Sequence, residues 1–115
     1  MGEVLAAKEA DRRGYRILNQ NVRTPFGEVD LILQKPDTGI VFAEVKTRSS
    51  LFYGYPEEAV SSTKLSHMVN SARYLINHYF KNDVPWQIDV IAILYDKRRE
   101  KITDLSWFEN VTAGF

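Results

Sequence analysis

The sequence contains no cysteine among its 115 residues, which excludes disulfides, thiolate metal sites and a cysteine nucleophile. Histidine is also scarce, and the spacing of His67 and His78 suits no common zinc site. We therefore expect both histidines to be solvated helix residues and not metal ligands. No apolar stretch approaches the roughly 20 residues of a membrane span, and no N-terminal run resembles a signal peptide, so we expect a cytoplasmic protein.

An excess of charge of one sign is missing too, because fifteen basic residues balance fifteen acidic ones. A net charge of zero argues against a general nucleic-acid coat protein, which is usually basic. It does not exclude a nuclease, since a local basic surface can hold phosphates while carboxylates cluster elsewhere. With 44% apolar residues and the length of one typical domain, residues 1–115 are expected to form a single domain with its own core.

Hydrophobic periodicity predicts an α/β domain with a mixed sheet flanked by helices, in the order α-β-β-β-α-β with one further short strand possible. The expected elements are a helix over Glu3–Arg13 closed by Gly14, strands over Tyr15–Val22, Glu28–Lys35 and Ile40–Thr47, a helix from Ser61 or Ser62 to Phe80, a strand over Gln87–Tyr95, a turn at Lys97–Arg99 and an edge strand over Lys101–Leu105. The apolar run Ile88–Leu94 predicts a central strand that is covered on both faces. Residues 48–62 read as irregular, and Trp107–Phe115 carries no assignable pattern.

Three charged residues stand on the two strands that the turn at Pro36–Gly39 joins. Glu44 and Lys46 share a face, because side chains two apart on a strand point the same way. A three-residue turn over Asp37–Gly39, with Pro36 opposite Ile40, would place Asp30 opposite Lys46, and a five-residue loop would place it opposite Glu44. A four-residue loop would instead put Asp30 on the other face of the sheet.

This set of side chains suits a magnesium or manganese site. Two neighbouring carboxylates in an apolar sheet repel each other without a cation. Mg²⁺ prefers oxygen ligands, so Asp30 and Glu44 are candidate ligands, together with the backbone carbonyl of Val45. Such a metal would polarise a phosphodiester oxygen and lower the pKa of a bound water, while Lys46 would orient that water or neutralise developing charge. The alternative is a salt-bridge cluster without a metal, since Glu-x-Lys alone is a common pattern.

Short motifs along nearly the whole chain resemble a known family. They are Gly2-Glu3, Gly14–Leu18, Asn21–Arg23, Gly27–Ile32, Val41–Arg48, Gly54, Glu58–Val60, Lys64 and Asp89–Ile91. Together they resemble the YraN-like family, small bacterial proteins related to archaeal Holliday-junction resolvases. The chain departs from that family in beginning almost at Gly2-Glu3, and in having Gln87-Ile88 where the family often has Arg-Phe.

The resemblance implies a restriction-endonuclease-like fold with a PD-(D/E)xK site. Carried over by position, Asp30 would be the motif aspartate, Glu44 the second acid and Lys46 the motif lysine. Glu3 would be the acid of the first helix that approaches the metal, although an acid at a helix N-terminus is also favoured by the dipole alone. The implied activity is a Mg²⁺- or Mn²⁺-dependent endonuclease acting on DNA, including branched or flapped structures.

Basic residues outside the motif are candidate phosphate contacts, namely Arg48, Lys64 and Arg73, each weighed against an ordinary solvated position. A rival hypothesis is a catalytically inactive module that binds nucleic acid or protein on the nuclease scaffold. The zero net charge motivates it. The choice of DNA or RNA and the oligomeric state stay open, although a resolvase-like enzyme is expected to act as a homodimer.

Overall fold

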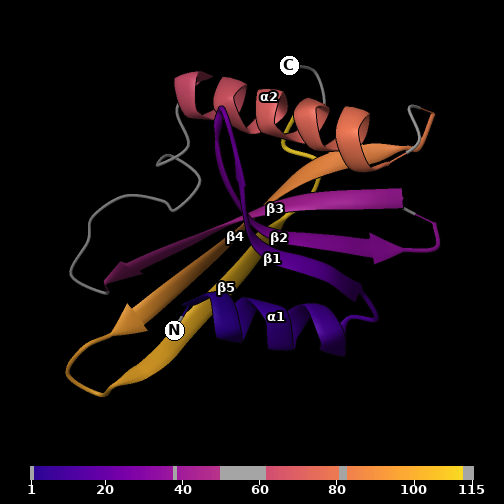
Figure 1. The fold of residues 1–115 in the computed structure, drawn as a ribbon. Coiled ribbons are helices and arrows are strands. Elements are labelled where there is room, and N and C mark those ends of the chain that lie inside the picture. Colours follow the sequence, from indigo (N-terminus) through magenta and orange to yellow (C-terminus); the bar gives the residue numbers. More distant parts are fainter. Residues whose placement is uncertain (1, 38, 50–61, 81–82, 113–115) are drawn as a thin grey trace.

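The structure is a computed structural model that describes residues 2–37, 39–49, 62–80 and 83–112. Its elements follow one another as α1 (Gly2–Arg12), β1 (Arg16–Thr24), β2 (Gly27–Lys35), β3 (Gly39–Ser49), α2 (Ser62–Tyr79), β4 (Trp86–Asp96) and β5 (Lys101–Phe108). This confirms the predicted order, including the further strand. A twisted five-stranded sheet separates the two helices, which cover opposite faces (Figure 1).

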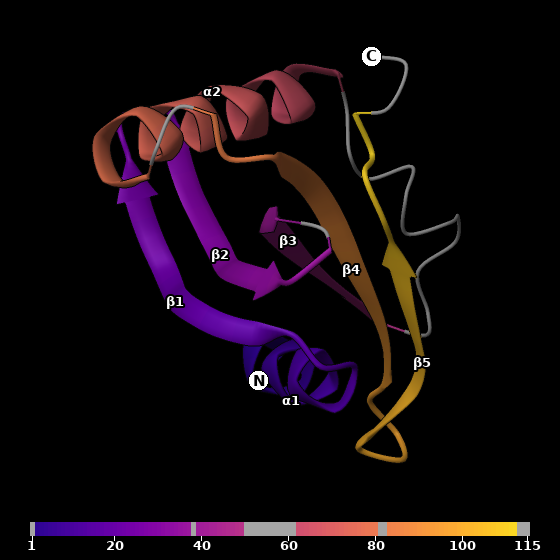
Figure 2. The same cartoon turned by 90° about the vertical axis from the view of Figure 1, so that its right-hand side faces the viewer.

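The strands lie in the sheet in chain order, but they do not all run the same way. β1, β2 and β3 form an antiparallel meander, β3 and β4 are parallel, and β5 returns antiparallel to β4. Parallel neighbours need a crossover connection, and α2 lies in that connection, over one face of the sheet (Figure 2). This mixed topology is the α/β arrangement that the resemblance implied.

Alternation along the strands divides the core between the two helices. On the α1 face, Ala6 and Ala10 pack with Leu31, Leu33, Val41, Ala43, Ile91 and Ile93. On the α2 face, Ala72, Leu75 and Ile76 pack with Val29, Ile32, Ile40, Phe42 and Ile88. β4 is buried without interruption from Ile88 to Ile93 and has a strand on each side, so the predicted central strand is confirmed.

The chain near the C-terminus is more ordered than its pattern suggested. β5 extends to Phe108, because Trp107 pairs with Ile91 and Phe108 with Val90. Val111 then donates its N–H to the carbonyl of Ile88 at 2.8 Å, which continues the attachment to β4. Residues 50–61 fall in the segment predicted to be irregular, and that part of the prediction lies outside the described residues.

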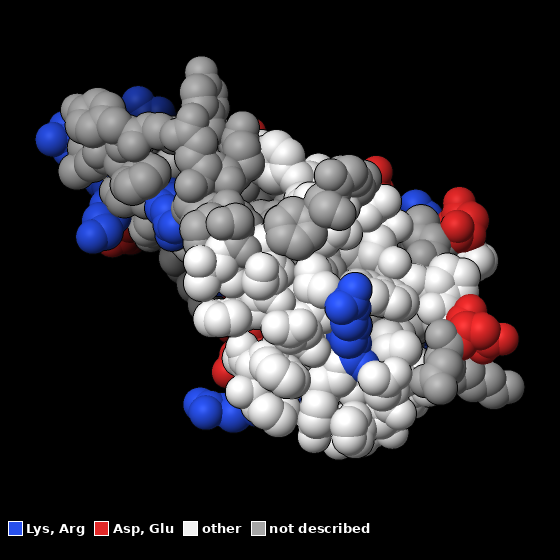
Figure 3. Space-filling model, turned by 90° about the horizontal axis from the view of Figure 1, so that it is seen from above, with Lys and Arg blue, Asp and Glu red and all other residues white. Residues whose placement is uncertain are grey.

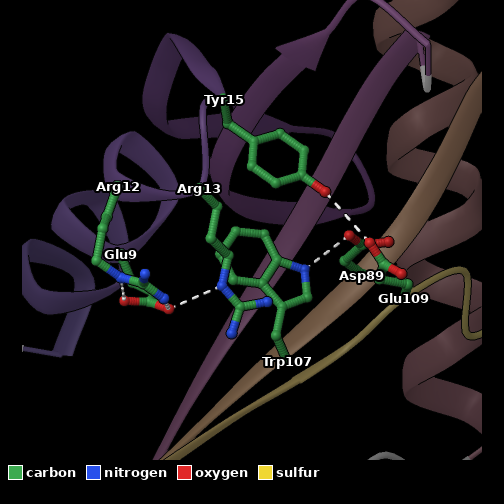
Figure 4. A network of polar contacts seen from close by, with 7 residues as sticks. All are labelled: Glu9, Arg12, Arg13, Tyr15, Asp89, Trp107 and Glu109. Carbon is green, nitrogen blue, oxygen red and sulfur yellow. Dashed lines mark hydrogen bonds and ion pairs between the residues drawn. The ribbon is translucent and has the colours of Figure 1, made fainter.

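Asp89 fastens this segment to the sheet (Figure 4). Its fully buried carboxylate accepts three hydrogen bonds, from Trp107 Nε1 at 2.8 Å, Asn110 N at 2.8 Å and Gln87 Nε2 at 2.9 Å. The Trp107 ring stacks on Tyr15 with 5.1 Å between centroids. Each donor compensates part of the cost of burying the carboxylate, so Asp89 is a structural residue. Neither helix of the described chain is long and apolar enough to cross a membrane.

Candidate functional site

A polar cavity of about 430 Å³ opens between the β1–β2 hairpin, β3 and the first turns of α2. It is lined by Phe26, Gly27, Glu28, Asp30, Glu44, Thr63, Lys64, His67, Met68 and Ser71. The α2 residues among these recur at helical spacing, so one stripe of the helix forms a wall. The hairpin is tied to that helix by a 2.8 Å hydrogen bond between the hydroxyls of Thr24 and Ser71.

Asp30 stands where β2 and β3 stop pairing. The two strands pair from Lys35↔Gly39 to Leu31↔Ala43, whereas β2 stays paired with β1 as far as Gly27. Extending this register by one residue brings Asp30 level with Glu44, which is the second of the two arrangements expected. The expected five-residue loop is wrong, because the strands pair up to Lys35↔Gly39 and leave three residues between them. The carboxylate of Asp30 accepts the N–H of Val45 at 2.7 Å. This side-chain bond joins β2 to β3 beside the cavity, where the backbone pairing of the two strands has ended.

Glu44 lies at the centre of the site and is 9% exposed. Its Oε1 is 3.3 Å from Lys46 Nζ and 3.0 Å from Lys64 Nζ. Lys46 comes from the same strand face, as the alternation predicted, while Lys64 reaches in from α2. A single carboxylate oxygen therefore holds two ammonium groups, one from each layer of the fold.

Burial changes the acidity of two of these groups. Burial raises the pKa of Asp30 to about 6, against the lowering effect of the Val45 N–H bond, and the neighbouring charges of Glu44, Glu3 and Glu28 add to the rise. The pKa of Lys46 is lowered by burial and by the adjacent ammonium of Lys64. Both groups thus exchange protons closer to neutral pH than an exposed aspartate or lysine does.

Asp30 also belongs to a group of three carboxylates. Oxygens of Glu3, Glu28 and Asp30 lie within 4.8 Å of one another, and α1 supplies the first while β2 supplies the other two. Oxygen donors this close fit the ligand preference of Mg²⁺ or Mn²⁺, which keeps several waters as well. Glu44 stands outside this group. Both ammonium groups contact its Oε1, so Oε2 is the oxygen through which it would reach a cation.

The sequence analysis assigned no role to Glu28. It stands two residues before Asp30, and the same alternation that paired Glu44 with Lys46 would have placed both acids on one face. Glu3 was placed by the resemblance, and its helix packs against the sheet close enough to bring the carboxylate to Asp30.

The remaining predicted residues are spread around the site. Arg48 lies further along β3, beyond Lys46, and its Nη1 donates to the carbonyl of Thr47. Arg73 is exposed on α2 and is not among the residues that line the cavity. Nine residues at 100° each put it half a turn around the helix from Lys64. His67 is exposed, as expected, and sits on the cavity wall.

Comparison with known proteins gives consistent family matches. The profile described as "Uncharacterised protein family UPF0102" matches residues 2–93. A UPF0102 protein of Caldicellulosiruptor saccharolyticus is 37% identical over 109 residues, covering 95% of this chain and 91% of its own. One from Vibrio parahaemolyticus is 38% identical over 112 residues, covering 96% and 88%.

Among solved structures, an XisH family protein from Nostoc punctiforme aligns with 93% of this chain and 98% of its own. The TM-score is 0.46 and the sequence identity is 13%.

Proposed function

The chain belongs to the UPF0102 family, and from the chemistry of its cavity we propose that it is a divalent-metal-dependent nuclease that hydrolyses phosphodiester bonds in DNA. Branched or flapped structures are the proposed substrates, following the relation to junction resolvases that the sequence motifs imply.

One observation carries the proposal: acids and ammonium groups lie side by side at one site, around a cavity that Glu28, Asp30, Glu44 and Lys64 line. Oxygens of Glu3, Glu28 and Asp30 gather at 4.8 Å or less, while Lys46 and Lys64 converge on Glu44. Hydrolysis of a phosphodiester uses both the acids and the ammonium groups. A cation held by the acids offsets the charge of the phosphate, and an ammonium group stabilises the charge that develops at phosphorus. A purely structural ion-pair cluster would not require the additional acids beside Asp30.

Each residue then has a distinct role. A Mg²⁺ or Mn²⁺ ion would be held by Asp30 with Glu3, Glu28 and Glu44 around it, and when bound it supplies a polarised phosphate oxygen and a more acidic water. The N–H of Val45 fixes one oxygen of Asp30, which orients the carboxylate. The Val45 carbonyl remains a proposed further ligand.

The two lysines act on the phosphate side of the cavity. Lys46, with its lowered pKa, is suited to orient the attacking water or to take and return its proton. Lys64 lies at the start of α2, where it would bind a nonbridging phosphate oxygen.

The inactive-module alternative has one observation in its favour. Lys46 and Lys64 already compensate the charge of Glu44, so this part of the site is satisfied without a metal. A scaffold that had lost catalysis would keep such ion pairs for stability.

A cleavage assay separates the two. Single-stranded, duplex, flapped and four-way-junction DNA are incubated with Mg²⁺ or Mn²⁺ and the wild type, Lys46→Ala, or the control Lys8→Ala on the exposed side of α1. We expect the wild type to cut a flapped or branched substrate. The cleavage rate should fall at least about 100-fold for Lys46→Ala and stay unchanged for the control. Equal cleavage by all three proteins would refute the role of Lys46, and no cleavage of any structure would favour the inactive module.

A further inference from the structure

A basic edge borders the sheet where β3 and β4 end together. These strands are parallel, so their carboxyl ends meet on one side, and the β4–β5 turn continues from there. The basic edge consists of Lys46, Arg48, Lys97, Arg98, Arg99 and Lys101. Asp96 and Glu100 offset it within the β4–β5 turn, and Glu44 pairs with Lys46, in a chain whose net charge is zero.

The charge of the molecule is correspondingly uneven. Seen from the α2 side, basic side chains gather toward the end where β3 and β4 finish, and the most prominent acidic ones lie at the opposite end (Figure 3). Asp37 and Asp83, both exposed, belong to that opposite end, near the β2–β3 turn and the start of β4. Such a separation creates a local positive potential that overall neutrality conceals.

The β4–β5 turn holds its charges on a defined backbone. Asp96 Oδ1 accepts the N–H groups of Arg98 at 2.9 Å and Arg99 at 3.2 Å. Arg99 Nε is also 3.7 Å from Asp96 Oδ2, with its side chain 71% exposed. Because the backbone bonds do not involve the basic side chains, Lys97 and Arg98 project from a turn that is already ordered.

The basic edge is continuous with the candidate site. Lys46 and Arg48 follow Glu44 on the same face of β3, level with Ala92 and Leu94 of β4. Glu44 is level with Val90, and seven residues at about 3.3 Å each place Lys97 at most about 23 Å further on. That length corresponds to about seven base pairs of duplex DNA at 3.4 Å per pair.

We propose that the basic edge binds the phosphate backbone of one duplex arm of a DNA substrate, with the phosphate to be cut lying at Asp30 and Lys46. The inference rests on the proposed function, and it adds that the enzyme contacts about seven base pairs on one side of the cut.

The test measures binding in EDTA, so that it does not depend on metal or cleavage. Fluorescence anisotropy follows a labelled 20-base-pair duplex over a range of salt concentrations. The variant Lys97→Ser/Arg98→Ser removes two charges and keeps the Asp96 bonds, and the control Lys8→Ser/Arg16→Ser removes two exposed charges elsewhere. Thermal melting checks that both variants are folded.

We expect the slope of log Kobs against log[salt] for the 20-base-pair duplex to fall by about 1.8 in the edge variant and not in the control. The control should bind the 20-base-pair duplex with the salt dependence of the wild type. The inference would be overturned if the wild type did not bind the duplex, or if the edge variant had the same slope as the wild type. It would also be overturned if the slope changed equally in the edge variant and the control. Cleavage in the preceding assay would still stand, so the two proposals fail separately.

Discussion

Asp30 is a carboxyl group whose surroundings favour its neutral form unless a cation is present. Burial and three neighbouring acids raise its pKa to about 6 from the ordinary 3.8. A bound cation must therefore displace a proton below that pH. We predict that Mn²⁺ affinity falls by about tenfold per pH unit below pH 6 and levels off above pH 7. Titrations between pH 5 and 8 measure this, and an affinity that stayed constant down to pH 5 would contradict it.

The same pKa has a consequence for the metal-free protein. A folded pKa above the unfolded value means that Asp30 contributes stability below about pH 3.8 that is lost as pH rises through about 6. Asp30→Asn keeps an oxygen that can accept the Val45 N–H but has no charge. We predict that in EDTA this variant melts above the wild type at pH 8 and loses its advantage by pH 4. The exposed control Asp104→Asn should show no such crossover. A melting temperature of Asp30→Asn below that of the wild type at pH 8 would contradict the prediction.

Among the acids of the candidate site, Glu44 is predicted to contribute most to the stability of the fold, in contrast with Glu28. Replacing Glu44 by Gln leaves Lys46 and Lys64 beside each other without their shared counter-charge. We expect Glu44→Gln to lose about 1–3 kcal/mol of unfolding free energy in urea, and Glu28→Gln, which is exposed, to lose little. Equal losses would mean that the ion pairs contribute no net stability.

At the scale of elements, one buried carboxylate strengthens the attachment of the end of β5 to β4, in addition to the backbone ladder between the two strands. Asp89→Asn replaces an acceptor of three hydrogen bonds with a group that has one oxygen and an N–H pair facing a donor. We predict that Asp89→Asn lowers the free energy of unfolding by at least about 2 kcal/mol. Trp107→Phe keeps an aromatic ring against Tyr15 and removes one hydrogen bond, so we expect a loss of about 1 kcal/mol. Urea denaturation measures both losses. A smaller loss for Asp89→Asn than for Trp107→Phe would show that packing, and not the carboxylate, holds the end of β5.

The elements also show how far sequence reasoning reaches. α2 and the first three strands were predictable from helical or alternating apolar periods, α1 from its helix-forming residues and the Gly14 cap, and β4 from its continuous apolar run. The full length of β5 was not, since Trp107 and Phe108 join it through pairing with β4 and the bond to Asp89. The shared face of Glu44 and Lys46 followed from alternation. The face of Asp30 depended on the register of the hairpin, which the sequence left open, and the reach of Lys64 to Glu44 depends on how α2 crosses the sheet.

At the scale of the whole molecule, the end of β2–β3 pairing makes room for the site. The β1–β2 hairpin continues past β3, α2 starts above the gap, and α1 brings Glu3 from the other side of the sheet. All three layers therefore contribute a charged side chain to one site. This convergence explains why a metal should bind only the folded chain and raise its stability, by about 2.7 kcal/mol at 100 times Kd.

The most direct test of the central claim is calorimetric titration of Mn²⁺ into the wild type, Asp30→Asn and the control Asp104→Asn at pH 7.5, without DNA and again with a non-cleaved phosphorothioate duplex. The account predicts saturable binding by the wild type and the control, and affinity at least about tenfold weaker for Asp30→Asn. Equal binding by all three proteins, or no binding by the wild type with or without DNA, would contradict a metal site at Asp30.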